Sequence, residues 1–337
     1  MLAAIFNGPY NISLADYPLA RLEPEQLLVK VGACGVCGTD FHIYEGKSPS
    51  KPPVILGHEY VGEIIDLGRG VISFKMGDHI AINPNIHCGR CELCRVRKIN
   101  LCKNLKALGV TLNGGFAEYS IVPLSQAYLI PKDFSLSLAA FAEPLSCCLR
   151  GMEQAKIKHG DSVVIIGGGT IGLMMVQLVK IAGAAKIILI EPEPFKQNLG
   201  ISLGADYAFD SADNNITEEI KELTHSQTDV IIECVGKSET VELAVKLAGR
   251  GCNIVIFGLA PIDQNITINL QHLFMNEIKI SHSYLNPFTF KPAVDLLIAG
   301  KINVQKLITN QIRLKNINNI FHNNIDTSSI KQQIINN

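Results

Sequence analysis

The chain has 337 residues, 47% of them hydrophobic and 18% charged, and its formal net charge is −1. This length suits two domains of roughly 100–200 residues each, and the composition excludes a disordered chain. Because no block of like charges stands out, we expect no nucleic-acid partner. The first residues lack the basic segment that opens a secretory signal, so we expect a cytoplasmic protein.

Short β-rich segments fill the first 150 residues. They occupy residues 27–31, 61–65, 79–82 and 116–122, with glycines and prolines between them. This spacing is typical of a strand-rich, barrel-like domain.

From about residue 160, short apolar runs alternate with helix-compatible stretches. The runs occupy residues 163–166, 186–190, 207–209, 230–233, 253–257 and 278–281. Apolar strands that alternate with helices predict a parallel sheet covered on both faces. Six such strands are typical of a doubly wound dinucleotide-binding (Rossmann) domain, which makes the chain an α/β protein. Residues 288–299 predict a further helix, and the Asn- and Ile-rich tail beyond it carries no clear pattern.

A stretch of 18 uncharged residues between Asp161 and Lys180 approaches the length of a membrane span. It contains a glycine cluster directly after a β-branched run. This order favours a strand, a turn and a helix over one continuous apolar helix. We therefore expect no membrane partner.

The glycine cluster fits the pattern G-x-G-x-x-G directly after a predicted strand. Its glycines permit a tight turn, close approach to a pyrophosphate and close packing of the following helix, whose N-terminus presents free N–H groups. The predicted cofactor-binding residues of this turn are Gly167, Gly169, Thr170, Ile171 and Gly172. A glycine cluster alone is weak evidence, because many α/β turns need glycine.

Glu191 strengthens the dinucleotide interpretation. It lies 19 residues after Gly172, at the end of the next apolar run. An acid at this place accepts hydrogen bonds from the adenosine ribose and repels a 2′-phosphate, which favours NAD over NADP. Lys196 nearby either softens that repulsion or belongs to a solvated helix face.

Six of the ten cysteines lie between residues 34 and 102, and clustered cysteines in a chain of this size favour metal binding over disulfides. Cys88, Cys91, Cys94 and Cys102 supply four thiolates within 15 residues. Tetrahedral zinc takes four such ligands, and a closed shell leaves no position for substrate, so we expect a structural zinc. The spacing differs from that of a bacterial ferredoxin cluster. A nucleic-acid-binding finger would have aromatic residues among its basic ones, and none accompany the basic residues here.

A second, dispersed constellation contains Cys37, His58, Glu59 and Glu143. A thiolate, an imidazole and a carboxylate make a three-ligand zinc site with one open position, the arrangement of catalytic zinc. A second carboxylate either ligates directly or holds the metal-bound water. Two other interpretations stay open on spacing alone, a Cys34–Cys37 redox pair and a purely structural His58.

Together these motifs resemble the zinc-dependent medium-chain alcohol and polyol dehydrogenases, with sorbitol dehydrogenase-like and threonine 3-dehydrogenase members as near relatives. Besides the glycine turn and the four cysteines, the resemblance rests on Cys37-Gly38-Thr39-Asp40-x-His42, Gly57-His58-Glu59, Gly77-Asp78, Gly114-Gly115-Phe116-Ala117-Glu118-Tyr119 and Glu143-Pro144-Leu145-Ser146. It implies a GroES-like catalytic domain built from residues 1–150 and 285–337, with a zinc lobe at about 86–103. It also implies a Rossmann domain over residues 151–284.

The resemblance further implies the site chemistry. Cys37 and His58 bind the catalytic zinc, and either Glu59 or Glu143 is the third protein ligand. The metal lowers the pKa of a bound alcohol. Thr39 accepts the alcohol proton and relays it through the cofactor ribose to His42, and Asp40 orients His58.

Two strand-end loops match loops that approach the nicotinamide in such relatives. They contain Phe257-Gly258-Leu259 and His282-Ser283-Tyr284, and simple strand termini are the alternative interpretation. We expect Cys147, Cys148, Cys234 and Cys252 to pack as small hydrophobic residues.

The sequence therefore predicts a zinc- and NAD-dependent dehydrogenase that interconverts a secondary alcohol, a polyol in particular, and its ketone. Sorbitol dehydrogenases carry Arg-Tyr where this chain has Ser283-Tyr284, which leaves the individual polyol open. The alternatives are L-threonine 3-dehydrogenase, another secondary-alcohol or diol dehydrogenase and, from a different class, a non-catalytic NAD-binding sensor. By analogy with relatives, we expect a homo-oligomer, either dimer or tetramer.

Overall fold

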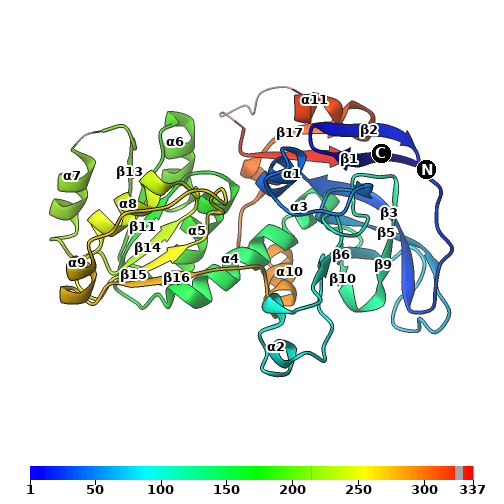
Figure 1. The fold of residues 1–337 in the computed structure, drawn as a ribbon, viewed down its shortest axis with the longest axis horizontal. Coiled ribbons are helices and arrows are strands. Elements are labelled where there is room, and N and C mark those ends of the chain that lie inside the picture. The colour runs from blue at the N-terminus through cyan, green and yellow to red at the C-terminus, as the bar shows by residue number, and fades with distance from the viewer. Residues whose placement is uncertain (214, 323–328, 337) are drawn as a thin grey trace. The chain divides into compact units, whose positions relative to one another are not determined.

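The computed structural model describes residues 1–213, 215–322 and 329–336, and the chain forms two compact units (Figure 1). Unit 1 comprises Met1–Ser146 and Leu285–Asn337, and unit 2 comprises Cys147–Tyr284. The sequence pattern places the first boundary slightly later, at residue 150. Unit 1 is thus assembled from both ends of the chain, while unit 2 is continuous.

In the described part of unit 1, the strands form a mixed seven-stranded sheet and two smaller sheets. The large sheet has the order β10-β6-β5-β3-β18-β17, and β9 also pairs with β3. Its strands are β3 (Gln26–Gly35), β5 (Glu59–Leu67), β6 (His79–Ile82), β9 (Tyr119–Pro123), β10 (Ala127–Ile130), β17 (Ile308–Arg313) and β18 (Lys331–Ile335). The smaller sheets are β2-β1-β4 (Asn11–Asp16, Leu2–Gly8, Val54–Ile55) and β7-β8 (Asn85–Ile86, Lys106–Ala107).

The helices of unit 1 are short. They are α1 (Gly38–Tyr44), α2 (Glu92–Arg95), α3 (Leu136–Ala139), α10 (Phe290–Ile298) and α11 (Asn318–His322), and α4 (Ala142–Ala155) continues into unit 2. Single 3₁₀ turns occupy Ile99–Leu101, Leu124–Gln126, Gln305–Leu307 and Leu314–Asn316. The core between these elements is apolar and includes Phe6, Leu27, Tyr60, Phe116 and Ile334, all at most 2% exposed.

The strand-rich prediction for the first half of the chain is confirmed, and the segment predicted at 79–82 has the bounds of β6, but the other predicted segments are too short or slightly displaced. The strand predicted at 27–31 extends through Gly35, and the strand predicted at 116–122 begins only at Tyr119. The tail, which carries no clear pattern, contains β17 and β18. Alternation fails in β18 because Lys331 and Gln333 are among its buried residues, so polar side chains face inward.

Unit 2 contains a six-stranded parallel sheet with the order β13-β12-β11-β14-β15-β16, the strand order of a doubly wound domain. The strands are β11 (Ser162–Ile166), β12 (Lys186–Ile190), β13 (Tyr207–Phe209), β14 (Val230–Glu233), β15 (Asn253–Ile256) and β16 (Lys279–His282). The helices are α5 (Thr170–Ile181), α6 (Pro194–Leu203), α7 (Ile216–Leu223), α8 (Ser238–Leu247) and α9 (Leu270–Met275). The predicted Rossmann sheet is therefore confirmed.

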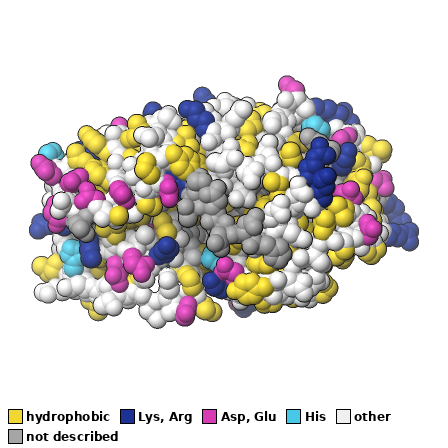
Figure 2. Space-filling model, turned by 90° about the horizontal axis from the view of Figure 1, so that it is seen from above, with side chains coloured by type: hydrophobic (Ala, Val, Ile, Leu, Met, Phe, Trp, Pro, Cys, Tyr) yellow, Lys and Arg dark blue, Asp and Glu magenta, His cyan; other side chains and the backbone are white. Residues whose placement is uncertain are grey.

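The uncharged stretch after Asp161 divides into β11, the glycine turn and α5, as the sequence predicts. Within the described residues, no helix combines the length and apolar character needed to cross a membrane. Side chains of both charges are interspersed with apolar ones on the face shown in Figure 2.

Candidate metal and dinucleotide sites

The glycine turn between β11 and α5 has the geometry that its sequence requires. Gly167 has a φ of +102°, a conformation that favours glycine. A Cβ added at Gly172 would lie 1.8 Å from the carbonyl oxygen of Gly167, so only glycine lets the helix start this close to the strand. Gly169 is the N-cap of α5, and a Cβ added there would have no described atom within 4 Å apart from its own chain neighbours. Thr170 and Ile171 open the helix, whose first N–H groups face a potential anion.

Glu191 follows β12 and is buried beside this turn. One carboxylate oxygen accepts a hydrogen bond from the Gly168 N–H at 2.6 Å, and the other accepts one from the Glu193 N–H at 3.1 Å. The structure thus brings an acid to the glycine turn, where an adenosine ribose is held in doubly wound domains.

Lys196 is buried, with 8% of its surface exposed, so the solvated helix face considered from the sequence is wrong. Its ammonium lies 5.9 Å from the ring centroid of Phe195. Lys196 lies in the first turn of α6, five residues after Glu191, so its ammonium group is in the same region of unit 2 as that carboxylate.

The two strand-end loops of unit 2 differ in exposure. Phe257 and Gly258 donate backbone hydrogen bonds to the carbonyl oxygen of Glu233 at 2.8 and 3.0 Å. Leu259 and Tyr284 are exposed, while the Ser283 hydroxyl is buried and has no hydrogen-bond partner among the described residues. Their contact with a nicotinamide stays a prediction.

Glu233 is a residue of this region that sequence reasoning missed. Its fully buried carboxylate accepts hydrogen bonds of 2.8 Å from the Val235 and Gly236 N–H groups and from the Thr240 hydroxyl. It therefore shapes the loop after β14. The available signal was an acid at the end of an otherwise apolar strand.

The four cysteines of the lobe meet in space. Their sulfur atoms all lie within 4.8 Å of one another. The Sγ atoms of Cys91 and Cys94 are 3.5 Å apart, and those of Cys91 and Cys102 are 3.9 Å apart. A tetrahedral zinc with Zn–S bonds of about 2.3 Å separates its sulfurs by about 3.8 Å. All four are free thiols, so the donor set fits a structural zinc.

Hydrogen bonds from backbone amides stabilise the thiolate form of two cysteines in this lobe. N–H groups at Arg90 and Cys91 lower the pKa of Cys88 to about 6, and N–H groups at Cys94 and Lys103 lower the pKa of Cys91. Burial, together with the neighbouring sulfurs, raises the pKa of Cys94 to about 12. Without a cation, therefore, the four sulfurs cannot all be deprotonated near neutral pH.

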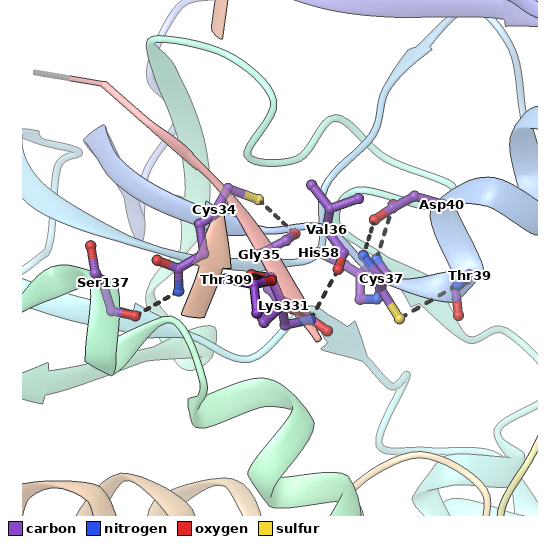
Figure 3. A network of polar contacts seen from close by, with 12 residues as sticks. Cys34, Gly35, Val36, Cys37, Thr39, Asp40, His58, Ser137, Thr309 and Lys331 are labelled. Atoms are coloured by element: carbon purple, nitrogen blue, oxygen red, sulfur yellow. Dashed lines mark hydrogen bonds and ion pairs between the residues drawn. The ribbon is translucent and has the colours of Figure 1, made fainter. Parts of the chain in front are cut away.

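The second cluster lies in unit 1 and joins two distant segments of the chain. The Sγ of Cys37, a ring nitrogen of His58 and a carboxylate oxygen of Glu59 all lie within 4.8 Å of one another. Cys37 is the N-cap of α1 and accepts a 3.5 Å hydrogen bond from the Thr39 N–H. Glu59 begins β5, a partner strand of β3, and His58 immediately precedes it (Figure 3 shows Cys37 and His58 together).

Asp40 holds the first two members of this cluster. Its carboxylate accepts a 2.9 Å hydrogen bond from the Cys37 N–H and lies 3.4 Å from Nδ1 of His58. Burial opposes protonation of His58, but Asp40 and Cys37 together outweigh it and raise the pKa of His58 well above its usual value. Since Nδ1 faces Asp40, Nε2 is the nitrogen left for a metal.

Glu59 has a partner that no sequence pattern indicated. Nζ of Lys331, on β18, lies 2.5 Å from Oε2 of Glu59, and both residues are buried. Burial opposes the charge on Lys331, but Glu59, with Cys37 and Asp40, outweighs it and raises the pKa of the lysine.

Glu143 is not part of the group of ligand atoms within 4.8 Å. It lies in the first turn of α4 and is buried, and its carbonyl oxygen accepts a 2.5 Å hydrogen bond from the Ser146 hydroxyl. Thr39 and His42 lie on α1, three residues apart and both half-buried. The structure thus brings Thr39 and His42 to the helix that Cys37 begins.

The remaining cysteines do not form a second reactive centre. Burial, with Asp40 and Glu59 nearby, raises the pKa of the Cys34 thiol well above its usual value. A redox-active thiol requires the opposite shift, so a Cys34–Cys37 redox pair finds no support. Cys148 and Cys252 are fully buried, as expected, whereas Cys147 and Cys234 are half-buried.

Comparisons with known proteins agree with this architecture. Residues 23–132 match the model of the alcohol dehydrogenase GroES-like domain, and residues 170–299 match that of the zinc-binding dehydrogenases. The sorbitol dehydrogenase of Bacillus subtilis is 32% identical over 94% of this chain and 91% of its own length. The L-threonine 3-dehydrogenase of Pyrococcus horikoshii is 32% identical over 93% and 92%, respectively.

A solved structure extends the comparison. A zinc-binding dehydrogenase from Sinorhizobium meliloti, bound to NADP, is 38% identical, covers 99% of both chains and superposes with a TM-score of 0.97. A GroES-like domain, a Rossmann domain and a thiolate–imidazole–carboxylate cluster together define a metal-dependent dehydrogenase. The chain belongs to the zinc-binding medium-chain dehydrogenases and is an NAD(P)-dependent oxidoreductase.

Proposed function

We propose that the protein oxidises a polyol, such as a pentitol or hexitol, to the corresponding ketose with NAD as hydride acceptor. The observation that carries this proposal is the meeting of Cys37, His58 and Glu59 in one cluster of unit 1. Similarity to a sorbitol dehydrogenase supports a polyol as substrate.

Each residue of the cluster has a distinct task in this proposal. Cys37 and His58 hold the catalytic zinc, and Glu59 is the third ligand, with Glu143 as the alternative. When bound, zinc supplies a Lewis acid that makes an alcohol easier to deprotonate. Asp40 fixes the His58 ring and the Cys37 backbone.

The proton path and the structural site complete the assignment. Thr39 accepts the alcohol proton, and His42 returns it to solvent from the same helix. Cys88, Cys91, Cys94 and Cys102 hold a second zinc that stabilises the lobe. The protein thus carries two zinc ions with different tasks.

Glu191 supports NAD as the cofactor. A buried carboxylate at the ribose position disfavours a 2′-phosphate. The buried Lys196 and the NADP-bound relative from S. meliloti favour the alternative, NADP. The remaining predicted contacts are those of the glycine turn and of Phe257, Gly258, Leu259, Ser283 and Tyr284.

Substrate oxidation tests the function directly. NADH absorbance should rise with members of a polyol panel and not with L-threonine. The opposite result would establish the threonine 3-dehydrogenase alternative.

A Cys37→Ser variant should lose one of two zinc ions and all turnover while it keeps its fold, and normal turnover would contradict the catalytic assignment. Zinc binding with no turnover on any alcohol would favour the NAD-binding sensor.

We also propose a cytoplasmic homo-oligomer. β16 is an edge strand of the parallel sheet, and Leu270, Phe274 and Met275 on the neighbouring α9 are exposed apolar side chains. An open strand edge beside exposed apolar residues is suited to pairing with a second copy. Light scattering gives the mass that tests this assembly.

A further inference from the structure

The side chain of Lys331 reaches across a strand of the large sheet. Lys331 begins β18, which neighbours β3, and Glu59 begins β5 on the other side of β3. On β3, Gly35 pairs with Glu59 on one side and with Gln333 on the other. A Cβ at Gly35 would lie 2.1 Å from Oε2 of Glu59, so the glycine leaves the space that the carboxylate fills.

Lys331 and Glu59 form a buried ion pair. Nζ lies 2.5 Å from Oε2 of Glu59 and donates a 3.0 Å hydrogen bond to the carbonyl oxygen of Val36 (Figure 3 shows Lys331 beside Val36). The two side chains are 5% and 2% exposed, so solvent screens their attraction little. The last strand of the chain thus places a fixed cation on Glu59.

The same carboxylate also belongs to the cluster with Cys37 and His58. The ammonium of Lys331 and a metal ion in the cluster would therefore compete for the carboxylate of Glu59. An ammonium on one oxygen weakens the carboxylate as a ligand, and its charge repels a divalent ion nearby. Asp40 faces His58 rather than Lys331, so it does not replace Glu59 as the partner of the lysine.

We propose that Lys331 is a positioning residue that competes with the catalytic metal for Glu59. It keeps Glu59 an exchangeable ligand, so that a coordination position stays available to the alcohol. This inference rests on the proposed metal site and adds to it a residue from the other end of the chain.

Metal affinity tests the competition. In Lys331→Met, zinc should bind the Cys37 cluster at least tenfold more tightly, as measured by competition with a chromophoric chelator. With cobalt in the site, the visible absorption should change as Glu59 becomes a permanent ligand, while Lys331→Arg should keep the wild-type spectrum. Unchanged or weaker zinc binding by a folded Lys331→Met variant would overturn the proposal.

A double-mutant cycle identifies Glu59 as the group through which Lys331 acts. In the Glu59→Gln background, Lys331→Met should raise zinc affinity by a much smaller factor, because the carboxylate is gone. The double variant also leaves no buried charge unpaired, so it serves as the folding control. Equal gains in both backgrounds would show that the lysine acts without Glu59 and would overturn the proposal.

The folding of Lys331→Met is itself informative. If this variant folds only when zinc is present, then zinc has replaced the lysine as the cation on Glu59, and the midpoint of thermal unfolding should rise steeply with zinc concentration. Failure to fold at saturating zinc would contradict the competition.

The Cys37→Ser variant distinguishes an error in the proposed metal site from an error in the role of Lys331. If Cys37→Ser and the wild type bind equal amounts of zinc, the proposed metal site itself is wrong. If Cys37→Ser loses one zinc but Lys331→Met binds zinc with wild-type affinity, only the role of Lys331 is wrong.

Discussion

Oδ1 of Asp40 lies 3.4 Å from Nδ1 of His58, and both side chains are almost completely buried. This carboxylate and the sulfur of Cys37 together outweigh the cost of burial and raise the pKa of the imidazole well above its usual value. In the metal-free protein, His58 is therefore charged over a wider pH range than a free histidine. The pair that orients a metal ligand also holds a proton that a metal must displace.

Zinc binding at Cys37 and His58 should accordingly release protons near neutral pH. Metal affinity should rise with pH until the pH passes the raised pKa of His58. Calorimetry in buffers of different ionisation enthalpy measures the protons released. Asp40→Asn should lower the pKa of His58 and reduce the proton release from this residue, and an unchanged release would contradict the role of Asp40.

The same pair gives the metal-free protein a pH-dependent stability. A histidine pKa that is raised by folding contributes stability that is fully present below the unfolded pKa of about 6.5. This contribution is lost as the pH rises through the folded pKa. Urea unfolding of the metal-free protein should show it, with Asp40→Asn as the comparison. A contribution that grows with rising pH would have the wrong sign.

The four-cysteine lobe predicts a loss of zinc that is specific to its sulfurs. Cys94→Ser should lose one zinc per chain, measured by atomic absorption, because a closed shell needs all four thiolates. Cys252→Ser is the matched control, since Cys252 is a buried thiol outside both clusters. Retention of both zinc ions by Cys94→Ser would argue against this site.

Glu191 predicts the choice between the two dinucleotides. Removal of its carboxylate in Glu191→Ala should raise the ratio of kcat/KM with NADP to that with NAD at least tenfold, since each factor of ten corresponds to about 1.4 kcal/mol. Glu193→Ala removes a nearby acid that is not at the turn and should leave the ratio nearly unchanged. Equal shifts in both variants would indicate a general charge effect.

The glycine turn predicts a contrast between two neighbouring glycines. Gly172→Ala should destabilise the protein by about 1–3 kcal/mol, because its Cβ would collide with the Gly167 carbonyl oxygen. Gly169→Ala should have a much smaller effect, since no described residue beyond its own chain neighbours has an atom within 4 Å of the Cβ position. The free energies of unfolding in urea give both values, and equal losses would contradict this account of the turn.

The Rossmann sheet could be predicted because its strands are apolar on both faces. The predicted bounds of β12, β13 and β14 are those of the structure. β18 could not be predicted in this way, because two of its buried positions hold Lys331 and Gln333. These polar residues are explained only by partners that are distant in sequence.

The candidate site was predictable in its ligands but not in their surroundings. The chemistry of zinc and the family resemblance indicated Cys37 and His58 as two ligands, but they did not distinguish Glu59 from Glu143 as the third. Only Glu59 lies in the cluster. Lys331 carried no signal, since a single lysine in a polar tail resembles any other.

The two chain ends that form unit 1 have a consequence for biosynthesis. β18 inserts between β3 and β17 in the large sheet, so this sheet is incomplete until residues 331–335 have left the ribosome. Unit 2 is continuous and is synthesised earlier, so it can fold first. The cluster at Cys37 receives Lys331 only after unit 2 has been synthesised, so a metal ion bound there by the nascent chain would lack the lysine that opposes it.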